Sequence, residues 1–160
     1  LAAEQALQQF SRAHQLPVVS FRFFNVYGTG QDPRSPYSSV ISTFTNALLQ
    51  KQTISIFGEG DQSRDFISVS DICKACLSAL QLPNEKANGQ PINLGFGART
   101  TISNLVNELI QITGTQVSIN KLPKRAGDID HSLADIQKAK NLLHWNPQVT
   151  LHEGLKALLT

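Results

Sequence analysis

The feature that most limits the fold of this chain is an apolar run over residues 18–24, which directly follows Leu16-Pro17. Only Ser20 and Arg22 interrupt the run, so a strand formed there is mainly apolar on both faces. Strands of this kind normally lie inside a parallel sheet, and parallel strands need long crossover connections that are usually helical. The run therefore predicts an α/β fold class.

Helix-type and strand-type patterns alternate along the rest of the chain, as an α/β or mixed α+β architecture requires. Three or four strands are candidates for a parallel sheet, which is too few for a doubly wound domain covered on both faces. The pattern therefore predicts that part of the sheet is missing. We expect strands over about 18–24, 54–57, 66–69, 91–94 and 117–122. We expect helices over about 1–14, 40–49, 71–82 with Ser70 as its cap, 103–113, 134–143 and from Thr150, where Glu153 completes a capping box.

The first helix-type pattern begins at Leu1 with no capping residue before it. Natural helices usually begin after Ser, Thr, Asp or Asn. Two interpretations are open: the sequence starts inside a helix of a longer protein, or a helix begins at a processed terminus. We favour the first.

Composition argues against several classes of protein. Hydrophobic residues make up 41% and charged residues 16%, which is typical of a globular domain, and the net charge of +2 is spread along the chain. This gives no support for a nucleic-acid or membrane-surface binder. No apolar run approaches the roughly 18 residues of a membrane span. The two cysteines, without a secretory signal, predict a reducing, cytoplasmic setting.

Loop residues are the first candidates for ligand binding. The loop over 25–30 follows the carboxyl end of a predicted buried strand, where open α/β sheets bind ligands, although an ordinary turn explains its glycines equally well. Arg64 and Arg125 lie on separate loops, each near an aspartate. Guanidinium groups match a diphosphate in bidentate geometry, but such pairs are often surface ion pairs of little energy. The residues alone leave both interpretations open.

Cys73-Lys74-Ala75-Cys76 is a competing catalytic motif near a predicted helix start. A thiol redox pair is one interpretation, because helix N-termini lower thiol pKa values. We favour the other, in which cysteine serves as a small hydrophobic residue of an amphipathic helix. Zinc would need a second pair of ligands. We predict no metal site, because the histidines are scattered: His14, His131, His144 and His152.

Taken together, several ordered segments resemble the extended short-chain dehydrogenase/reductase superfamily, and within it the NAD-dependent epimerase/dehydratase family. They are most similar to UDP-glucose and UDP-N-acetylglucosamine 4-epimerases. The resemblance covers nearly the whole chain. It implies that the chain corresponds only to the C-terminal part of such an enzyme. The segments are 22–28, 31–33 with 35–41, 56–60, 63–66 with 69–71, 92–95 and 125–128.

This resemblance also implies a fold and a domain organisation. Residues 1–160 would be the substrate-binding part, with a few strands of a Rossmann-type parallel sheet and a small mixed α/β domain. Remnants of the Rossmann sheet would lie in about 1–25 and 66–95. Residues 1–4 resemble the sequence that follows the lysine of the family's Tyr-x-x-x-Lys motif, so the N-terminal cofactor-binding part would be absent. The helix over 1–14 would contribute to a homodimer of the parent protein.

Roles for individual side chains follow from the same resemblance. Phe24 and Asn25 would lie by the nicotinamide of NAD, and Asn25 also by the sugar diphosphate. Ser39 would make a polar contact to the nucleotide-sugar. Phe57 and the backbone around Ser55 would flank the base.

The remaining predicted roles concern the diphosphate, the ribose and the sugar. Arg64 and Arg125 would hold the diphosphate, and Asp128 would help to hold the ribose. Ser132 matches a position at which related epimerases vary between bulky and small side chains. A serine there would leave room for N-acetylated hexosamines as well as hexoses.

The implied activity is that of an isomerase, in which the sugar is oxidised at C4, the ketosugar rotates and hydride returns. NAD would be bound mainly outside this segment, which lacks a Gly-rich loop and has no assigned catalytic residue, so we expect no activity from it alone. The substrate would be a nucleotide-sugar, with a UDP-sugar favoured. Alternatives are a 4,6-dehydratase or UDP-glucuronate decarboxylase and, in another class, a non-catalytic sugar-nucleotide-binding or dimerisation module.

Overall fold

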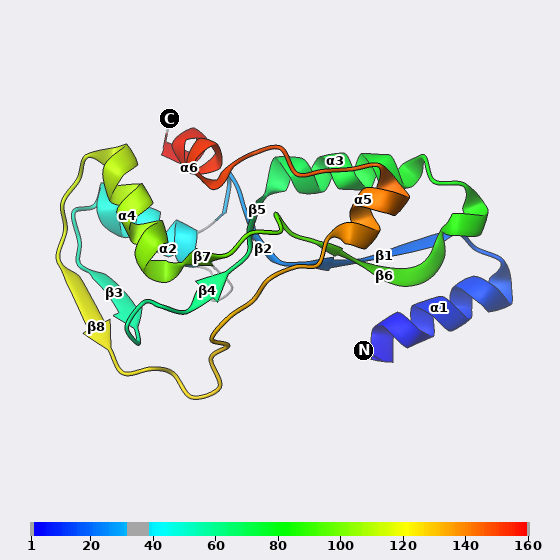
Figure 1. Ribbon diagram of the computed structural model, residues 1–160, viewed down its shortest axis with the longest axis horizontal. Helices are drawn as coiled ribbons and strands as arrows, with labels where there is room; N and C mark the ends of the chain where they lie inside the picture. The colour runs from blue at the N-terminus through cyan, green and yellow to red at the C-terminus, as the bar shows by residue number, and fades with distance from the viewer. Residues whose placement is uncertain (1, 32–38, 160) are drawn as a thin grey trace.

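The computed structural model describes residues 2–31 and 39–159, and its elements form two groups along the long axis of the molecule (Figure 1). One group contains the strand formed by the apolar run over residues 18–24. The other contains a second parallel strand pair and the helices beside it. Chain segments cross between the groups several times, so residues distant in sequence meet near the middle of the molecule. No helix in the described ranges is long and apolar enough to cross a membrane.

The first group is built on the parallel pair β1 (Val18–Phe23) and β6 (Asn88–Leu94). Its helices are α1 (Ala2–His14), α3 (Val69–Leu80) and α5 (Gln137–Leu143), and a 3₁₀ turn, Asn84–Lys86, precedes β6. Side chains from β6, α3, α5 and the segment after α5 form the core of this group, including Ile92, Leu94, Ile72, Ala75, Leu143 and Trp145. The apolar run over 18–24 thus forms the parallel strand that its composition predicts.

The second group is built on the parallel pair β3 (Ile54–Phe57) and β8 (Ile119–Leu122). The helices α2 (Val40–Leu49), α4 (Ile102–Thr113) and α6 (Leu151–Leu159) pack against one another beside it. Their shared core includes Ile41, Leu48, Leu105, Leu109 and Leu155. Ser39 caps α2 and Thr101 caps α4, each accepting a hydrogen bond from a backbone N–H of the first turn.

Two very short strand pairs lie between the groups. β2 (Asn25–Tyr27) pairs in parallel with β5 (Phe66–Ser68), and β4 (Ser63–Arg64) pairs antiparallel with β7 (Thr100–Thr101). Arg64 and Asn25, which belonged to separate predicted loops, are therefore both held in strands near the centre of the molecule.

The strand pairing corrects the predicted fold class. The prediction of one remnant of a Rossmann-type parallel sheet plus a small mixed domain was wrong in its topology. The described strands form four two-stranded sheets, three of them parallel. Pairs of two or three residues leave no periodicity that sequence patterning can detect, which is why β2, β4 and β7 were not predicted. Residues 32–33 and 35–38, which contributed to the family resemblance, lie outside the described residues.

Helix boundaries follow local capping chemistry. The predicted cap Ser70 is wrong: Ser68 is the cap, because its Oγ accepts the N–H of Ser70 at 3.3 Å, and α3 begins at Val69. The capping box at the last helix is confirmed. Glu153 Oε2 accepts the Thr150 N–H at 3.0 Å, and Thr150 Oγ1 accepts the Glu153 N–H at 3.3 Å.

Two fully buried aspartates join distant parts of the chain. Asp71, at the start of α3, accepts the N–H groups of Gln148 and Val149 on Oδ2 at 2.9 and 2.8 Å. The Trp145 indole N–H donates to the Asp71 carbonyl oxygen at 3.0 Å. Asp71 therefore fixes the segment between α5 and α6. Asp65 has a comparable arrangement near the centre of the molecule.

Tyr27 is buried, with 2% of its surface exposed, and this burial raises its pKa to about 12, with the negative charges of Asp71 and Glu153 adding to the effect. An unfolded tyrosine titrates near pH ~10. The folded state therefore keeps Tyr27 neutral over a range in which the unfolded state ionises. The stability due to this difference is fully present below pH ~10 and is lost as the pH rises through the folded pKa.

We expect the free energy of unfolding of the wild type to fall more steeply between pH ~10 and ~12 than that of the Tyr27→Phe variant. Urea unfolding across this range, followed by Trp145 fluorescence, measures the difference. Parallel pH profiles for the two proteins would show that Tyr27 contributes no pH dependence.

Candidate functional site

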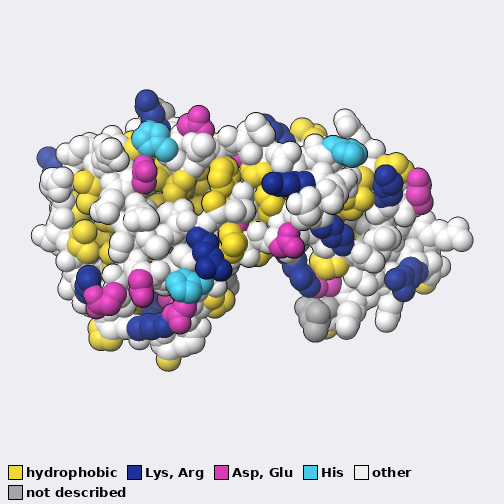
Figure 2. Space-filling model, in the orientation of Figure 1, with side chains coloured by type: hydrophobic (Ala, Val, Ile, Leu, Met, Phe, Trp, Pro, Cys, Tyr) yellow, Lys and Arg dark blue, Asp and Glu magenta, His cyan; other side chains and the backbone are white. Residues whose placement is uncertain are grey.

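A cavity of about 600 Å³ lies beside β2, β3, β4 and the first turn of α2. Figure 2 shows that the molecule is hollowed between the two groups and that basic, acidic and histidine side chains gather near β8 and the segment after it. The lining residues that were predicted as site residues are Phe24, Asn25, Ser39, Ser55, Phe57, Arg64, Arg125 and Asp128.

Arg64 enters this cavity from β4 in a fixed orientation. Its Nη2 donates to Asp128 Oδ1 at 2.6 Å, and its Nη1 donates to the carbonyl oxygens of Ile129 at 2.6 Å and Ser63 at 3.0 Å. The ion pair is partly buried, since the Arg64 side chain is 17% and the Asp128 side chain 30% exposed. Burial and several acceptors distinguish this pair from an exposed ion pair of little energy.

Arg125 enters the same cavity from the segment that follows β8. Its guanidinium carbon lies 3.6 Å from the centroid of the Phe57 ring, at the end of β3. This is a cation–π contact, in which the guanidinium lies over the face of the ring. The contact orients the guanidinium and does not use its N–H groups as hydrogen-bond donors to the ring. The cavity therefore brings together two arginines, an aromatic face and a carboxylate.

Ser132 is the predicted site residue that does not line this cavity. It is half-buried, and its N–H donates to the Ser63 carbonyl oxygen at 3.1 Å. Ser132 thus lies in the same segment as Asp128, bonded to the residue before Arg64. The binding roles of all these residues remain predictions, while their positions are structural facts.

Sequence reasoning missed three polar residues of the cavity, Gln31, Thr43 and Gln62. The Gln62 side-chain amide donates to the Phe57 carbonyl oxygen at 2.7 Å, so it supports the turn between β3 and β4. Ser39 Oγ donates to Gln31 Oε1 at 3.0 Å. The Gly58–Gly60 turn, which ends two residues before Gln62, was the available signal for Gln62, whereas nothing in the local pattern distinguished the other two.

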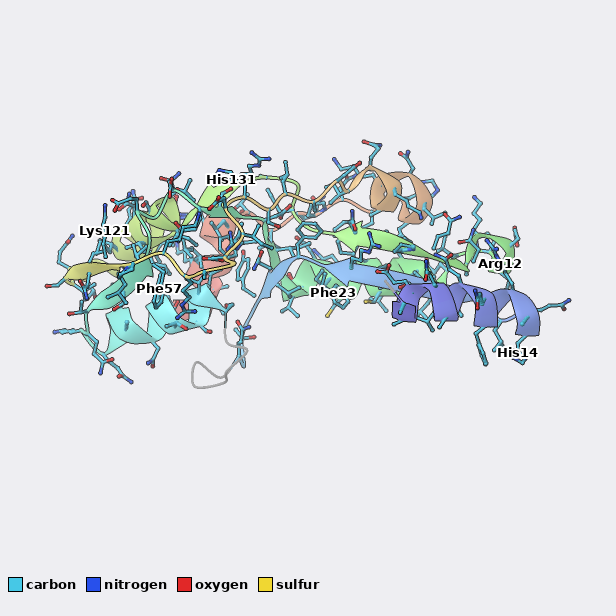
Figure 3. All side chains as sticks on the ribbon, turned by 90° about the horizontal axis from the view of Figure 1, so that it is seen from below. Arg12, His14, Phe23, Phe57, Lys121 and His131 are labelled. Atoms are coloured by element: carbon cyan, nitrogen blue, oxygen red, sulfur yellow. The ribbon has the colours of Figure 1, made fainter. Side chains whose placement is uncertain are left out.

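His131 is associated with a second cavity of about 530 Å³, which shares Phe57, Gln62 and Asp128 with the first. Its Nδ1 lies 3.0 Å from Ser63 Oγ. Figure 3 shows His131, Phe57 and Lys121 in one group of elements, while Phe23, Arg12 and His14 lie in the other. His131 therefore supports the backbone next to Arg64 and does not line the main cavity.

The Cys73–Cys76 pair lies on α3, away from this cavity, and both thiols are free. Cys73 is exposed, whereas Cys76 packs against the core of the first group. This packing agrees with the interpretation of cysteine as a small hydrophobic residue. Among residues 2–31 and 39–159, no group of three or more His, Cys, Asp or Glu side chains is placed to hold a metal ion.

Comparison with known proteins adds a family to this geometry. Residues 1–95 match the sequence model of the NAD dependent epimerase/dehydratase family. The chain is 34% identical over 155 residues to the uncharacterized UDP-glucose epimerase YtcB of Bacillus subtilis, covering 97% of this chain and 47% of that protein. It is 32% identical over 155 residues to the UDP-glucose 4-epimerase of Mycolicibacterium smegmatis, covering 97% of this chain and 48% of that protein.

A solved structure shows the same likeness in three dimensions. The UDP-glucose 4-epimerase of Thermotoga maritima with UDP-glucose superposes with a TM-score of 0.92 at 35% identity, covering 99% of this chain and 50% of that one. The UDP-N-acetylglucosamine 4-epimerase of Methanobrevibacter ruminantium has a TM-score of 0.91 at 33% identity, again over 99% of this chain and 50% of that one. The chain thus spans about half the length of these relatives.

The family match also corrects two predictions. The assignment to a C-terminal portion was wrong, because the match lies on the Rossmann-type part of the family, over residues 1–95. The predicted fold class, with its separate substrate domain, gives way to an α/β fragment with parallel strands.

The matched range covers more than half of the chain, and the relatives are related to it over nearly its whole length. They are NAD-dependent UDP-sugar 4-epimerases or similar proteins. The chain belongs to the NAD dependent epimerase/dehydratase family.

Proposed function

We propose that this chain provides the nucleoside-diphosphate site of an NAD-dependent UDP-sugar 4-epimerase. The observation that carries the proposal is that Arg64 and Arg125, from separate segments, line one cavity of about 600 Å³. Two oriented guanidinium groups suit a diphosphate, because their planar donors pair with phosphate oxygens in bidentate geometry.

The rest of the cavity suits the nucleoside. The Phe57 ring and the backbone at Ser55 offer an apolar surface to the base, and Asp128 offers carboxylate oxygens to the ribose hydroxyls. Arg125 covers the Phe57 ring in the structure. In the proposed complex Arg125 turns toward the diphosphate, and the base takes its place beside the ring. The relative from Thermotoga maritima, whose structure contains UDP-glucose, supports this choice of ligand.

NAD fits the residues of this chain only in part. Phe24 and Asn25 line the cavity and offer an apolar face and an amide to a nicotinamide ring. The 160 residues include no Gly-x-Gly-x-x-Gly sequence of the kind that binds the phosphates of a dinucleotide. We therefore propose that these two residues contact the nicotinamide end alone. When bound, NAD supplies the hydride acceptor for oxidation at sugar C4.

The contribution of this chain to the reaction is to hold the substrate. Binding energy from a part of the substrate that does not react can serve the reacting centre. With the diphosphate bound by Arg64 and Arg125, the sugar turns between two orientations while the nucleotide stays in place. Asn25 and Ser39 are placed to donate and accept hydrogen bonds at the sugar end of the cavity.

Calorimetric titration of the full chain with UDP and with uridine tests the binding site. We expect UDP to bind at least ~10-fold more tightly, because only UDP offers charge-assisted hydrogen bonds to the two arginines. Equal affinities would contradict the proposal.

A second experiment, on the complete enzyme, separates the possible activities. With NAD, conversion of UDP-glucose to UDP-galactose indicates an epimerase. A stable keto product indicates a 4,6-dehydratase, and release of carbon dioxide from UDP-glucuronate indicates a decarboxylase. Binding of UDP without any conversion indicates a non-catalytic module.

We further propose that Ser132 affects the choice of sugar. It does not line the cavity itself, but it follows Asp128 in the segment that borders it. A tyrosine at this position is expected to lower the preference for UDP-N-acetylglucosamine over UDP-glucose by roughly 10-fold, since pocket size discriminates by this order. The ratio of the two kcat/KM values in the complete enzyme measures the effect, with Ser132→Ala as the matched control. An unchanged ratio in Ser132→Tyr would exclude the role.

A further inference from the structure

Asp65 is a fully buried carboxylate next to Arg64. Its Oδ1 accepts the N–H of Phe96 at 2.7 Å, and its Oδ2 accepts the N–H groups of Gly97 and Ala134, each at 3.0 Å. A buried charge is costly unless hydrogen bonds compensate it, and these three bonds supply that compensation. Asp65 therefore joins three places in the chain: the link between β4 and β5, the loop after β6 and the segment after β8.

The two residues before Asp65 contact the segment after β8 as well, at residues 128–132. Arg64 contacts Asp128 and Ile129 through its guanidinium. Ser63 donates its N–H to the Asp130 carbonyl oxygen at 2.8 Å, accepts the Ser132 N–H at 3.1 Å, and has its Oγ 3.0 Å from His131 Nδ1.

The segment that receives these contacts has little structure of its own. Between β8 and α5 the chain forms no helix or strand apart from an isolated bridge at His131, and most of its residues are exposed. It nevertheless carries Arg125 and Asp128, two of the residues that line the main cavity. Its contacts with residues 63–65 therefore contribute to its shape, together with the contact of Arg125 with Phe57, and Asp65 supplies the most buried of its hydrogen bonds.

The junction around Asp65 has no spare room. A Cβ atom on Gly95 would lie 2.4 Å from the Ala134 Cβ and 2.8 Å from Asp65 Oδ2. Real Cβ atoms do not approach other atoms this closely, so glycine at 95 is what allows the carboxylate and Ala134 to meet. A Gly95→Ala change would displace this contact while leaving the Asp65 charge in the protein.

We infer that Asp65 is a positioning residue, which sets the placement of Arg125 and Asp128 relative to Arg64. The inference rests on the proposed function, because it concerns the geometry of the diphosphate site. Asp65 itself does not line the cavity, so it acts only through the segment after β8.

The test is a double-mutant cycle on UDP affinity, measured by calorimetry on the full chain. In Asp65→Asn the side chain keeps one acceptor oxygen and gains an N–H₂ group that faces backbone donors. We expect UDP affinity to fall on the order of 10-fold, as for a misplaced charge-assisted hydrogen bond. Arg125→Met should weaken UDP binding by at least as much. The double variant should lose little beyond Arg125→Met alone, because residues that act through one another are not additive.

Asp71→Asn is the matched control. Asp71 is also fully buried and also accepts backbone N–H groups of a distant segment, but it does not line the cavity. It should lower the thermal unfolding temperature without coupling to Arg125→Met. Gly95→Ala provides a second variant in case Asp65→Asn does not fold, and it should reproduce the coupling.

The outcomes separate the two claims. If the wild type binds UDP no better than uridine, the proposed function fails and this inference fails with it. If the wild type prefers UDP but Asp65→Asn or Gly95→Ala combines additively with Arg125→Met, or if Asp71→Asn couples equally, the inference alone is overturned. Coupling confined to Asp65 and Gly95 supports it.

Discussion

Replacing Arg64 with methionine is expected to weaken UDP binding by roughly 100- to 1000-fold, which corresponds to about 3–4 kcal/mol. The change removes the charge-assisted donors proposed for the diphosphate. It also leaves Asp128, whose side chain is 30% exposed, without the guanidinium that now lies 2.6 Å away. The uncompensated carboxylate would repel the phosphates as they enter the cavity. Calorimetric titration with UDP measures the loss.

Two variants control this experiment. Arg64→Lys keeps the positive charge but loses the planar fork, so an intermediate loss of about 10-fold is expected. Arg12→Met removes an exposed arginine on α1, in the group of elements away from Phe57 (Figure 3), and should leave UDP affinity unchanged. Equal losses in Arg64→Met and Arg12→Met would show that only net charge matters and would contradict the proposed site.

Replacing Gly154 with alanine is expected to lower the free energy of unfolding by about 2–3 kcal/mol, as overpacking of a filled core does. A Cβ atom at position 154 would lie 2.1 Å from Tyr27 Oη and 2.7 Å from two carbons of its ring. Both residues are buried in the wild type. With alanine at position 154, α6 therefore cannot lie as close to β2 as it does in the wild type. Alanine's higher helix propensity, worth about 1 kcal/mol, offsets part of the loss.

Urea unfolding followed by Trp145 fluorescence measures this stability change. Adding Tyr27→Phe removes the closest of the clashing atoms and should restore part of the lost stability, since the two residues are in direct contact. Lys156→Ala, on the exposed side of the same helix, should change stability by less than ~0.5 kcal/mol. A Gly154→Ala variant as stable as the wild type would contradict this prediction. It would mean that Tyr27 moves freely in spite of its burial.

Sequence reasoning performed best where local chemistry decides the structure. The helix over 40–49 and the strand over 54–57 have the predicted bounds, and the capping box of Thr150 and Glu153 is present. Amphipathic spacing and caps act within one or two turns, so the residues concerned lie next to one another in the sequence. The cap of α3 was misplaced by two positions because Ser68 and Ser70 are both suitable residues.

The pairing of the strands could not be obtained in the same way. A single remnant sheet was predicted, yet the described strands form four separate pairs. Which strands pair depends on hydrogen bonds between distant segments, such as those that join β3 to β8 and Ser63 to His131. The family resemblance pointed to eight lining residues of the cavity and also to Ser132, which lies beside the cavity and not in its lining.

The sequence by itself determined the alternating helices and strands of this protein, the capping box of its last helix, and the presence of two arginines near aspartates in different segments. Only the tertiary structure decided that Arg64 and Arg125 line the same cavity. It also decided that Asp128 both forms an ion pair with Arg64 and lines this cavity. The physical reason is that the segment carrying Arg125 and Asp128 has no regular structure of its own. Its course is set by hydrogen bonds to residues 63–65, which are distant in the sequence and adjacent only after folding.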